Sequence, residues 1–319
     1  MPSRAEQAEE KAQAPLIVIL GATAVGKTAL GLELAEEFDG EIVGADSRQI
    51  YRGMDIGTAK PSAQEQARVP HHLIDVRPPD GRMALATYQE MAYAAIDDIH
   101  RRGRVPFLVG GSALYLRAVT EGLRIPPVAP DPALRAELEA YAQVNGRAAL
   151  HARLQELDAD AAAGIHPNNL RRVVRALEIV QTTGRKKSEL EAARPPPYHI
   201  LKIGLDLPRA LLHERIDRRV EEMVAHGLVE EMSALLSAGF SPDLPAFSSL
   251  GYREIAAYLA GGTTLAAAVE RIQIETHRFV RHQYTWFRRM ADIHWYSCSE
   301  PPLAAIRELA ARFLRQDCD

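Results

Sequence analysis

The stretch GATAVGKT at residues 21–28 decides the fold of this chain. It fits the pattern G-x-x-x-x-G-K-[ST], in which glycines let the backbone wrap an anion and point its N–H groups at it. The apolar run PLIVIL precedes it and a helical pattern follows, which is the strand–loop–helix context that a phosphate-binding loop (P-loop) requires. The stretch therefore predicts a bound diphosphate, and by itself it favours the phosphates of ATP.

Each residue type in the loop has a physical task. Lys27 supplies a positive charge, and the N–H groups of residues 24–28 at the start of the helix face the anion. The Thr28 hydroxyl is placed to ligate Mg²⁺, which prefers oxygen ligands and phosphates, so we expect Mg²⁺ as the cofactor. The predicted diphosphate-binding residues are Gly21, Ala22, Thr23, Ala24, Val25, Gly26, Lys27 and Thr28. No N-K-x-D sequence occurs, which argues against a GTPase.

Length and composition indicate a globular protein of about two domains. The chain has 319 residues, of which 47% are hydrophobic and 25% charged, and its net charge of −4 argues against a uniformly basic nucleic-acid binder. Its two cysteines, Cys298 and Cys318, are too few for a disulfide scaffold or a four-cysteine metal site. No apolar run approaches the roughly 20 residues of a membrane span, and no signal peptide is recognisable. We expect a cytoplasmic monomer with a disordered polar tail at 1–14.

Short apolar runs alternate with helical patterns along most of the chain. The predicted strands are 15–21, 41–46, 71–76, 105–111, 200–207 and 292–296. Their density of Val and Ile is typical of buried parallel strands, and the alternation predicts an α/β fold. Between two proline clusters only helical patterns occur. We therefore predict a P-loop NTPase-like parallel sheet core (15–125 and 198–319) with an inserted α-helical subdomain (126–197).

Asp46 ends the second predicted strand. The carboxyl ends of parallel strands share one ligand crevice, so Asp46 should lie close to Lys27 and Thr28. Its carboxylate there could bind Mg²⁺ through water or act as a general base. A cap for a helix that begins near Ser47 is an equally good interpretation of this aspartate.

Positive charge is concentrated in NNLRRVVRALEIVQTTGRKK at residues 168–187. Leu170, Val173, Val174 and Leu177 form an apolar stripe at helical spacing, and Arg171, Arg172 and Arg175 lie off it. The six cations and Glu178 give this stretch a net charge of +5. Such a run is either a solvated face or a surface for an RNA backbone. Elsewhere, His71 and His72 lack a third metal ligand at suitable spacing, so we expect structural roles for them.

Six stretches together resemble the tRNA dimethylallyltransferase family, also called tRNA isopentenyltransferases. In order and spacing they are GATAVGKT, ADSRQIYRGMDIGTAKPS, HHLIDV, FLVGGSALYLRA, IHPNNLRRVVRALEI and GYREI, and the similarity covers about 15–297. The resemblance implies transfer of an isopentenyl group from dimethylallyl diphosphate to N6 of adenosine 37, beside the anticodon of tRNA. It also implies that the P-loop holds the diphosphate of the prenyl donor instead of ATP.

The resemblance assigns roles to individual residues. Asp46 would be the base that takes the proton from the adenine amine, and Arg219 would contact the diphosphate as a second catalytic residue. The implied tRNA contacts are Asp46, Ser47, Arg48, Gln49, Ser112, Arg171, Arg172, Val173, Val174, Arg175, Gly251, Tyr252 and Arg253. The implied partner is the anticodon stem-loop of tRNA.

The chain departs from the family pattern at residues 276–283. The family usually has T-R-x-x-A-K-R-Q there, whereas this chain has His277 and His282 where arginines are usual. We assign no role to these two histidines. If they face tRNA, binding should tighten below about pH 6.5, where imidazole gains a proton.

Three other functions fit the same loop. A small-molecule or nucleotide kinase would couple ATP hydrolysis to an acceptor but would leave the basic insertion unexplained. A prenyltransferase acting on free AMP would not need so long an insertion. A P-loop RNA-binding protein without catalysis would bind tRNA equally well after Asp46→Ala, whereas that substitution should abolish prenyl transfer and spare tRNA binding.

Overall fold

The computed structural model describes residues 14–126, 128–190, 196–299 and 303–316. The chain divides into two compact units, one formed by Met1–Thr120 with Pro197–Asp319 and the other by Glu121–Pro196. The predicted tail at 1–14 lies outside the described residues except for Ala14, which begins the first strand. No described helix is long and apolar enough to cross a membrane.

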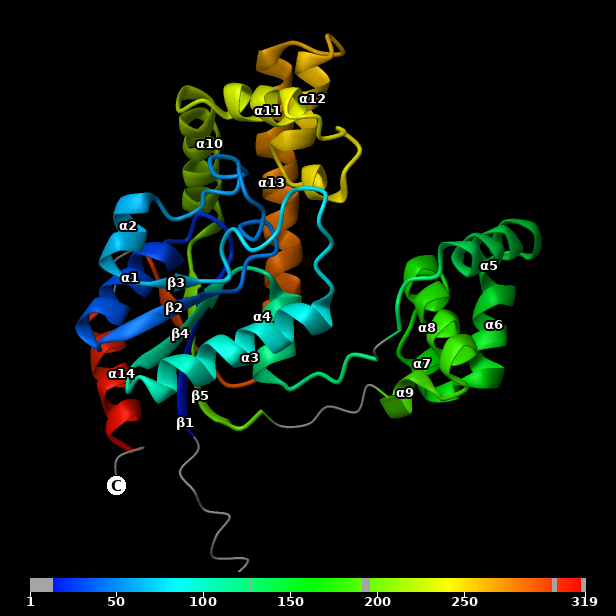
Figure 1. Ribbon diagram of the computed structural model, residues 1–319, viewed down its shortest axis with the longest axis horizontal. Helices are drawn as coiled ribbons and strands as arrows, with labels where there is room; N and C mark the ends of the chain where they lie inside the picture. Colours follow the sequence, from blue (N-terminus) through cyan, green and yellow to red (C-terminus); the bar gives the residue numbers. More distant parts are fainter. Residues whose placement is uncertain (1–13, 127, 191–195, 300–302, 317–319) are drawn as a thin grey trace, which may run out of the picture. The chain divides into compact units, whose positions relative to one another are not determined.

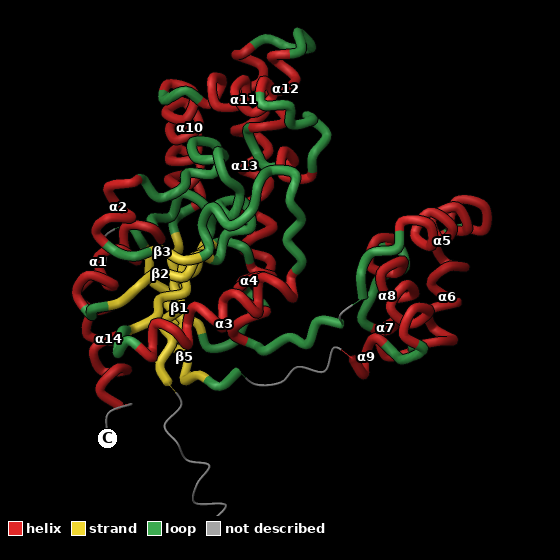
Figure 2. Tube along the Cα trace, in the orientation of Figure 1, coloured by secondary structure: helices red, strands yellow, loops and turns green. Residues whose placement is uncertain are grey.

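The larger unit is built on one six-stranded sheet in the order β3-β2-β4-β1-β5-β6, with every pair parallel (Figures 1 and 2). The strands are β1 Ala14–Gly21, β2 Gly40–Gly44, β3 His71–His72, β4 Val105–Gly110, β5 Tyr198–Asp206 and β6 Ile293–Ser297. This arrangement confirms the predicted α/β fold with a parallel core. The strand predicted at 71–76 is shorter, because Leu73 and Asp75 adopt positive φ angles of 63° and 54°, which end the extended conformation.

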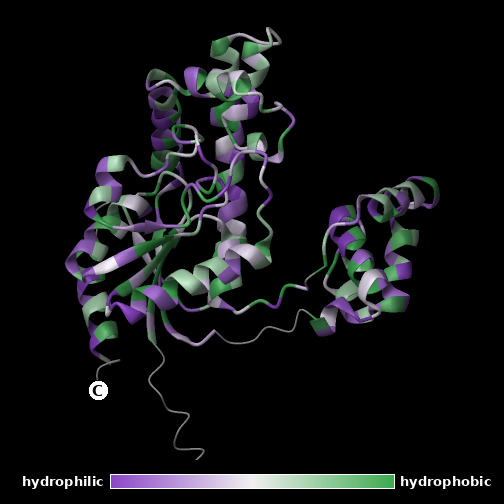
Figure 3. Cartoon of the chain, viewed as in Figure 1, coloured by the Kyte–Doolittle hydropathy of each residue, from purple (hydrophilic) through white to green (hydrophobic). Residues whose placement is uncertain are grey.

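Helices cover both faces of the sheet. They are α1 Lys27–Glu37, α2 Ala63–Arg68, α3 Leu85–Arg101, α4 Ala113–Thr120, α10 Arg209–Ala225, α11 Leu228–Ser237, α12 Tyr252–Leu259, α13 Leu265–Phe287 and α14 Leu303–Gln316. Side chains of a strand alternate between faces, so β1 contributes to two separate cores. Ile17 and Ile19 pack with α1 and the C-terminal helices, whereas Leu16 and Val18 pack with α3 and α4. Figure 3 shows hydrophobic residues along the strands and both colours on most helices, as amphipathic helices require.

The described part of the smaller unit is helical and has its own core. Its helices are α5 Pro132–Asn145, α6 Arg147–Leu157, α7 Ala159–Ala163, α8 Leu170–Thr183 and α9 Lys187–Leu190. Leu138, Leu150, Leu154 and Leu177 are buried together in this core. Helix α8 ends at Gly184, whose φ of 66° closes the helix in the left-handed conformation that glycine adopts without strain.

A buried carboxylate ties α5 to α8 in the smaller unit. Glu178 is fully buried and accepts hydrogen bonds from Arg135 and Arg175, each of whose guanidinium groups lies within 2.8 Å of it. Burial raises the pKa of Glu178, but hydrogen bonds from the two guanidinium groups outweigh burial and lower the pKa to about 2. The group is therefore ionised under ordinary conditions and fixes the two helices against each other.

Candidate active site

The P-loop joins β1 to α1 through backbone conformations that require glycine at two positions. A Cβ atom at Gly21 would lie 2.6 Å from the carbonyl oxygen of Leu205 on β5, so no other residue fits there. Gly26 has a φ of 104° and caps the N-terminus of α1. The first turn of α1 therefore begins directly at Lys27 and Thr28, with its N–H groups unpaired within the helix and available to an anion.

The ammonium of Lys27 is buried near one negative side chain, Asp46, and one positive side chain, Arg219. Its Nζ donates a hydrogen bond to the Ala22 carbonyl oxygen at 2.6 Å. Burial lowers the pKa of Lys27 to about 8, the carboxylate of Asp46 acts in the opposite direction, and the charge of Arg219 lowers the pKa further. A buried ammonium with two nearby charged groups binds an anion strongly, because anion binding supplies the missing counter-charge.

Asp46 follows β2 and closes a tight turn. Its Oδ1 accepts a hydrogen bond from the N–H of Arg48 at 2.8 Å, and residues 47–50 form a turn instead of a helix. The interpretation of Asp46 as the cap of a helix that begins near Ser47 is therefore wrong. Its side chain instead accepts the backbone N–H two residues further on, which closes an Asx turn. Capping occupies one carboxylate oxygen only, so it does not compete with a role for Asp46 in binding or proton transfer.

Arg219 projects from α10 toward the same place. Burial lowers the pKa of Arg219 from its ordinary value, and the carboxylate of Asp46 opposes that effect. Asp46 thus acts on both Lys27 and Arg219, which come from two different elements. The structure brings together the three side chains to which the sequence assigned chemistry.

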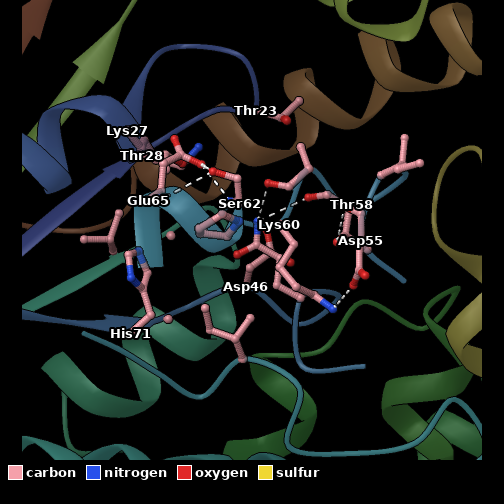
Figure 4. Close-up of a pocket in the computed structure, with 18 of the residues that line it drawn as sticks. Thr23, Lys27, Thr28, Asp46, Asp55, Thr58, Lys60, Ser62, Glu65 and His71 are labelled. Carbon is pink, nitrogen blue, oxygen red and sulfur yellow. Dashed lines mark hydrogen bonds and ion pairs between the residues drawn. The ribbon is translucent and has the colours of Figure 1, made fainter. Parts of the chain in front are cut away.

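These side chains line a cleft of about 920 Å³. Figure 4 shows Thr23, Lys27, Thr28 and Asp46 around it, together with residues of the 55–66 segment such as Lys60. One face of α10 completes the wall with Arg215, Arg219, Glu222, Met223 and His226. The cleft is therefore polar, charged and open at the carboxyl ends of the strands, as expected for an α/β phosphate site.

A second pocket of about 290 Å³ adjoins the cleft. Thr23, Ala24, Asp46, Thr58, Arg219 and Met223 line both. Beyond these shared residues, the apolar side chains of the second pocket come from α10, α13 and the loop before α12. They are Ile216, Val220, Leu250, Ile272 and Phe279, and the polar side chains of the same wall are Ser47, Arg48, Ser112, Ser248, Ser249, Thr276 and Gln283. The site therefore has a strongly charged half and a half with an apolar side, and Asp46 lies where the two meet.

The 55–60 segment is held by two sets of polar contacts. Glu231 on α11 accepts hydrogen bonds from the N–H groups of Asp55, Ile56 and Gly57 at 2.8–3.2 Å. Lys60 is almost fully buried and pairs with the carboxylates of Asp55 and Asp75, both at 2.5 Å. The segment is thus fixed by Glu231 and Asp75, which lie outside it, and by the ion pair of Asp55 with Lys60 within it.

Several side chains predicted to contact tRNA make contacts within the protein. Arg48 donates to the Pro245 carbonyl oxygen at 3.1 Å and to Ser248 Oγ at 3.2 Å. Gln49 donates to the carbonyl oxygens of residues 58 and 59. Ser112 Oγ accepts from the Ser47 N–H at 2.9 Å and donates to the Ser47 hydroxyl at 3.2 Å. These four residues shape the loop around Asp46.

Burial corrects the prediction for three other residues. Val173 and Val174 belong to the core of the smaller unit, so their side chains pack against other helices and present nothing to RNA. The side chain of Tyr252 is also completely buried, and its hydroxyl donates to Glu231 at 2.6 Å. Arg171, Arg172 and Arg253 are exposed, and Gly251 has a φ of 95° at the N-terminus of α12.

The two histidines at the positions of family arginines lie in different surroundings. The ring of His277 stacks on that of His213 with centroids 3.9 Å apart, and its Nε2 lies 2.8 Å from Asp217 Oδ1. His277 therefore faces α10. His282 is exposed, so the proposed pH effect on tRNA binding applies to it alone.

The residues present are compatible with a magnesium ion most of whose ligands come from a bound phosphate compound and only a few from the protein. Among the described residues, no group of three His, Cys, Asp or Glu side chains could hold a metal by itself. The hydroxyl-bearing Thr28 lines the cleft at the start of α1, beside the phosphate cradle. Mg²⁺ dehydrates reluctantly and usually binds through few protein groups plus phosphate oxygens, so a single hydroxyl at this cleft fits an ion that binds together with a phosphate-bearing ligand.

Sequence patterns missed Gln283 and Glu231. Gln283 lies on the buried side of α13 with Val280 and Phe287, and the spacing alone suggests a packing role. Its exposed fraction is 5%, which marks it as one of the few buried polar residues of the larger unit. Two signals in the sequence could have identified its role: a polar residue within an apolar stripe, and the match of Gln283 to the last position of the family pattern T-R-x-x-A-K-R-Q.

The fold and the site define a P-loop protein of the α/β class with a charged cleft and an adjoining pocket that has an apolar side. The family model for IPP transferase matches residues 49–290. The chain is 52% identical to the tRNA dimethylallyltransferase of Thermomicrobium roseum, covering 96% of this chain and 93% of that protein. It is 55% identical to the enzyme of the same name from Roseiflexus sp., covering 88% and 92%. The chain therefore belongs to the IPP transferase family of tRNA dimethylallyltransferases.

Solved structures agree with this assignment. The tRNA isopentenylpyrophosphate transferase of Bacillus halodurans is 40% identical and superposes with a TM-score of 0.72, covering 95% of this chain and 98% of that one. A eukaryotic dimethylallyltransferase acting on tRNA is 28% identical with a TM-score of 0.82, covering 95% and 80%.

Proposed function

We propose that this protein transfers the dimethylallyl group of dimethylallyl diphosphate to N6 of adenosine 37 in tRNA and releases diphosphate. Family membership supports the reaction class, since the relatives are named for this activity. The observation that carries the proposal is the meeting of a charged and an apolar pocket at Asp46. A prenyl diphosphate needs such a site, because one half of the donor is an anion and the other is hydrocarbon.

The diphosphate occupies the P-loop end of the cleft in this proposal. Lys27 and Arg219 stabilise the negative charge that develops on the leaving diphosphate, and the N–H groups at the start of α1 contribute as a fixed dipole. Thr28 would hold Mg²⁺, which would supply further charge neutralisation when bound. The C5 group enters the apolar pocket between α10 and α13, which excludes water from the reacting carbon.

The bond changes follow from this placement. The amine nitrogen N6 of adenine attacks C1 of the dimethylallyl group, and the bond between C1 and the diphosphate oxygen breaks with its electron pair leaving on oxygen. Asp46 accepts the proton that N6 loses, so the products are the prenylated adenosine, diphosphate and one proton. The target base must leave its stack to reach Asp46, as base-modifying enzymes generally require.

In this proposal the smaller unit binds the phosphate backbone of the tRNA. Exposed Arg171 and Arg172 lie at the start of α8, on the side opposite the buried valines. Cationic side chains on an exposed helix bind phosphates without reading sequence. Arg175 contributes differently, because its guanidinium is held by Glu178 and by the Val128 carbonyl oxygen.

The direct test supplies dimethylallyl diphosphate, Mg²⁺ and an unmodified tRNA with adenosines at positions 36 and 37. We expect a mass gain of one five-carbon unit on the nucleoside at position 37, located by digestion and mass spectrometry. ATP in place of the prenyl donor should give no covalent product and should compete with the donor for the P-loop. Folded protein that binds both substrates yet gives no mass gain would refute the proposal.

A further inference from the structure

Gln283 connects the P-loop to the end of β4. Its Oε1 accepts the backbone N–H of Thr23 at 3.0 Å, and its Nε2 donates to the Gly111 carbonyl oxygen at 2.9 Å. The three residues come from sequence regions separated by 260 and 172 positions, so α13 is joined to two loops of the site at once.

The geometry allows only one orientation of the amide. A flipped side chain would place its NH₂ against the Thr23 N–H and its oxygen against the Gly111 oxygen, losing both bonds. Both partners are backbone groups, which no substitution at positions 23 or 111 removes except proline at position 23. The side chain is 5% exposed and lines the second pocket, and loss of its amide removes this partner from both the Thr23 N–H and the Gly111 carbonyl oxygen.

Each of the two loops has an unusual backbone feature next to this connection. Thr23 lies on the boundary between the two pockets, directly before Ala24, whose φ of 65° is unusual for a residue other than glycine. On the other side, a Cβ atom at Gly111 would lie 2.7 Å from Gln283 Nε2 and 3.5 Å from Lys27 Nζ. The missing side chain of Gly111 therefore leaves the space into which both the Gln283 amide and the Lys27 ammonium approach.

We infer that Gln283 is a positioning residue of the diphosphate site, which acts by fixing Thr23 and Gly111 on either side of Lys27. It makes this contribution through the P-loop backbone and does not need to touch the ligand. The inference rests on the proposed function to the extent that the anion in the P-loop is a diphosphate. A purely structural role for Gln283, as an anchor of α13 in the core, is the competing explanation.

The test compares Gln283→Met with Gln273→Met in the full-length protein. Methionine keeps the volume of glutamine and removes both hydrogen bonds. Gln273 is a matched control, because it lies on the same helix, is partly buried and donates only to the Asp217 carbonyl oxygen at 3.4 Å, outside both pockets. The readouts are the affinity for Mg²⁺-pyrophosphate by calorimetry, the thermal midpoint, tRNA affinity, and kcat and KM for the prenyl donor.

We expect Gln283→Met to weaken pyrophosphate binding about tenfold, the equivalent of about one net hydrogen bond. KM for the donor should rise in parallel, and tRNA affinity should stay unchanged. Gln273→Met should alter none of the three. Gly111→Ala tests the same contact from the other side, since its Cβ would displace the amide, and it should weaken pyrophosphate binding in the same direction.

Gln283→Glu separates the two bonds. A carboxylate still accepts the Thr23 N–H but opposes the Gly111 oxygen and adds negative charge beside the anion, so we expect weaker pyrophosphate binding than with methionine. Pyrophosphate affinity within twofold of wild type for Gln283→Met and Gly111→Ala, with only a lower thermal midpoint, would overturn the inference. Failure of prenyl transfer by wild type would refute the proposed function and leave this affinity comparison intact.

Discussion

Asp46 combines two tasks in one side chain. One carboxylate oxygen closes the turn at residues 46–48, and the charge of the group acts on both Lys27 and Arg219. In the proposed mechanism Asp46 is the general base, and the turn fixes its orientation before substrate binds. Pre-orientation of this kind reduces the entropy that must be lost in the transition state.

Asp46→Asn should therefore separate catalysis from structure. Asparagine keeps an oxygen for the Arg48 N–H but cannot take up the proton from N6. We expect the rate of prenyl transfer to fall by about 10²–10⁴, the usual contribution of a general base, with tRNA affinity unchanged. Single-turnover transfer and a filter-binding assay measure the two quantities, and exposed Asp80→Asn serves as the control. An Asp46→Asn variant with near-wild-type single-turnover rates would show that another group accepts the proton.

The lowered pKa of Lys27 predicts that stability and anion binding at the candidate diphosphate site depend on the protonation of this residue. Its pKa of about 8 in the folded protein lies below the ordinary 10.5. Between these two values the unfolded chain binds more protons at this group than the folded one, so the free energy of unfolding should rise with pH across this window. Below about pH 8 the full cost of burying the ammonium remains, which a bound anion relieves.

Binding of pyrophosphate should accordingly raise the pKa of Lys27 and take up about half a proton near pH 8. Calorimetry in buffers with different ionisation enthalpies measures this uptake at constant pH. Lys27→Arg is the control, because arginine stays protonated throughout and its variant should show only the proton changes of pyrophosphate itself. Identical proton uptake by wild type and Lys27→Arg would place the titrating group elsewhere.

At the scale of elements, α11 holds the loop that faces the P-loop. The carboxylate of Glu231 accepts three consecutive backbone N–H groups and the hydroxyl of Tyr252. Gly57 is required beside it, because a Cβ atom there would lie 2.5 Å from the ring of Tyr252. The 55–60 segment thus has the ordered backbone of a binding site without secondary structure of its own.

Glu231→Gln should loosen this segment. The amide NH₂ of glutamine cannot accept a hydrogen bond, which leaves at least one of the backbone N–H groups of residues 55–57 without a partner, at a cost of about 1–3 kcal/mol in the free energy of unfolding. We also expect KM for the donor to rise, because this segment lines both pockets. Denaturant unfolding and steady-state kinetics test this, with exposed neighbouring Glu230→Gln as the control. Equal behaviour of the two variants would contradict the role given to Glu231.

Local patterns explain which elements could be predicted from the sequence. The strands and the P-loop were predictable, because apolar runs bounded by Gly and Pro and the glycine spacing of residues 21–28 are local signals. The end of β3 was not, since the left-handed conformation of Leu73 has no signature in a non-glycine residue. Gln283 and Glu231 were missed for a related reason: their partners lie more than 170 positions away, and only the folded chain brings them together.

At the scale of the whole molecule, the two units have separate cores. The core of the smaller unit includes Leu154 and Leu177, whereas Ile19 belongs to the core of the larger unit. The candidate diphosphate cleft and the apolar pocket are lined entirely by residues of the larger unit. Donor binding and the integrity of the helical unit are therefore separable properties of this chain.

Calorimetric unfolding of the full chain should consequently show two transitions instead of one. Mg²⁺-pyrophosphate at 100 times its dissociation constant should stabilise only the larger unit, by about 2.7 kcal/mol, because it binds that unit alone. Leu154→Ala should destabilise only the helical unit, by about 2–5 kcal/mol, since Leu154 is completely buried there. Ile19→Ala is its counterpart in the larger core. A single transition that both the ligand and Leu154→Ala displace would mean that the two cores unfold as one cooperative unit.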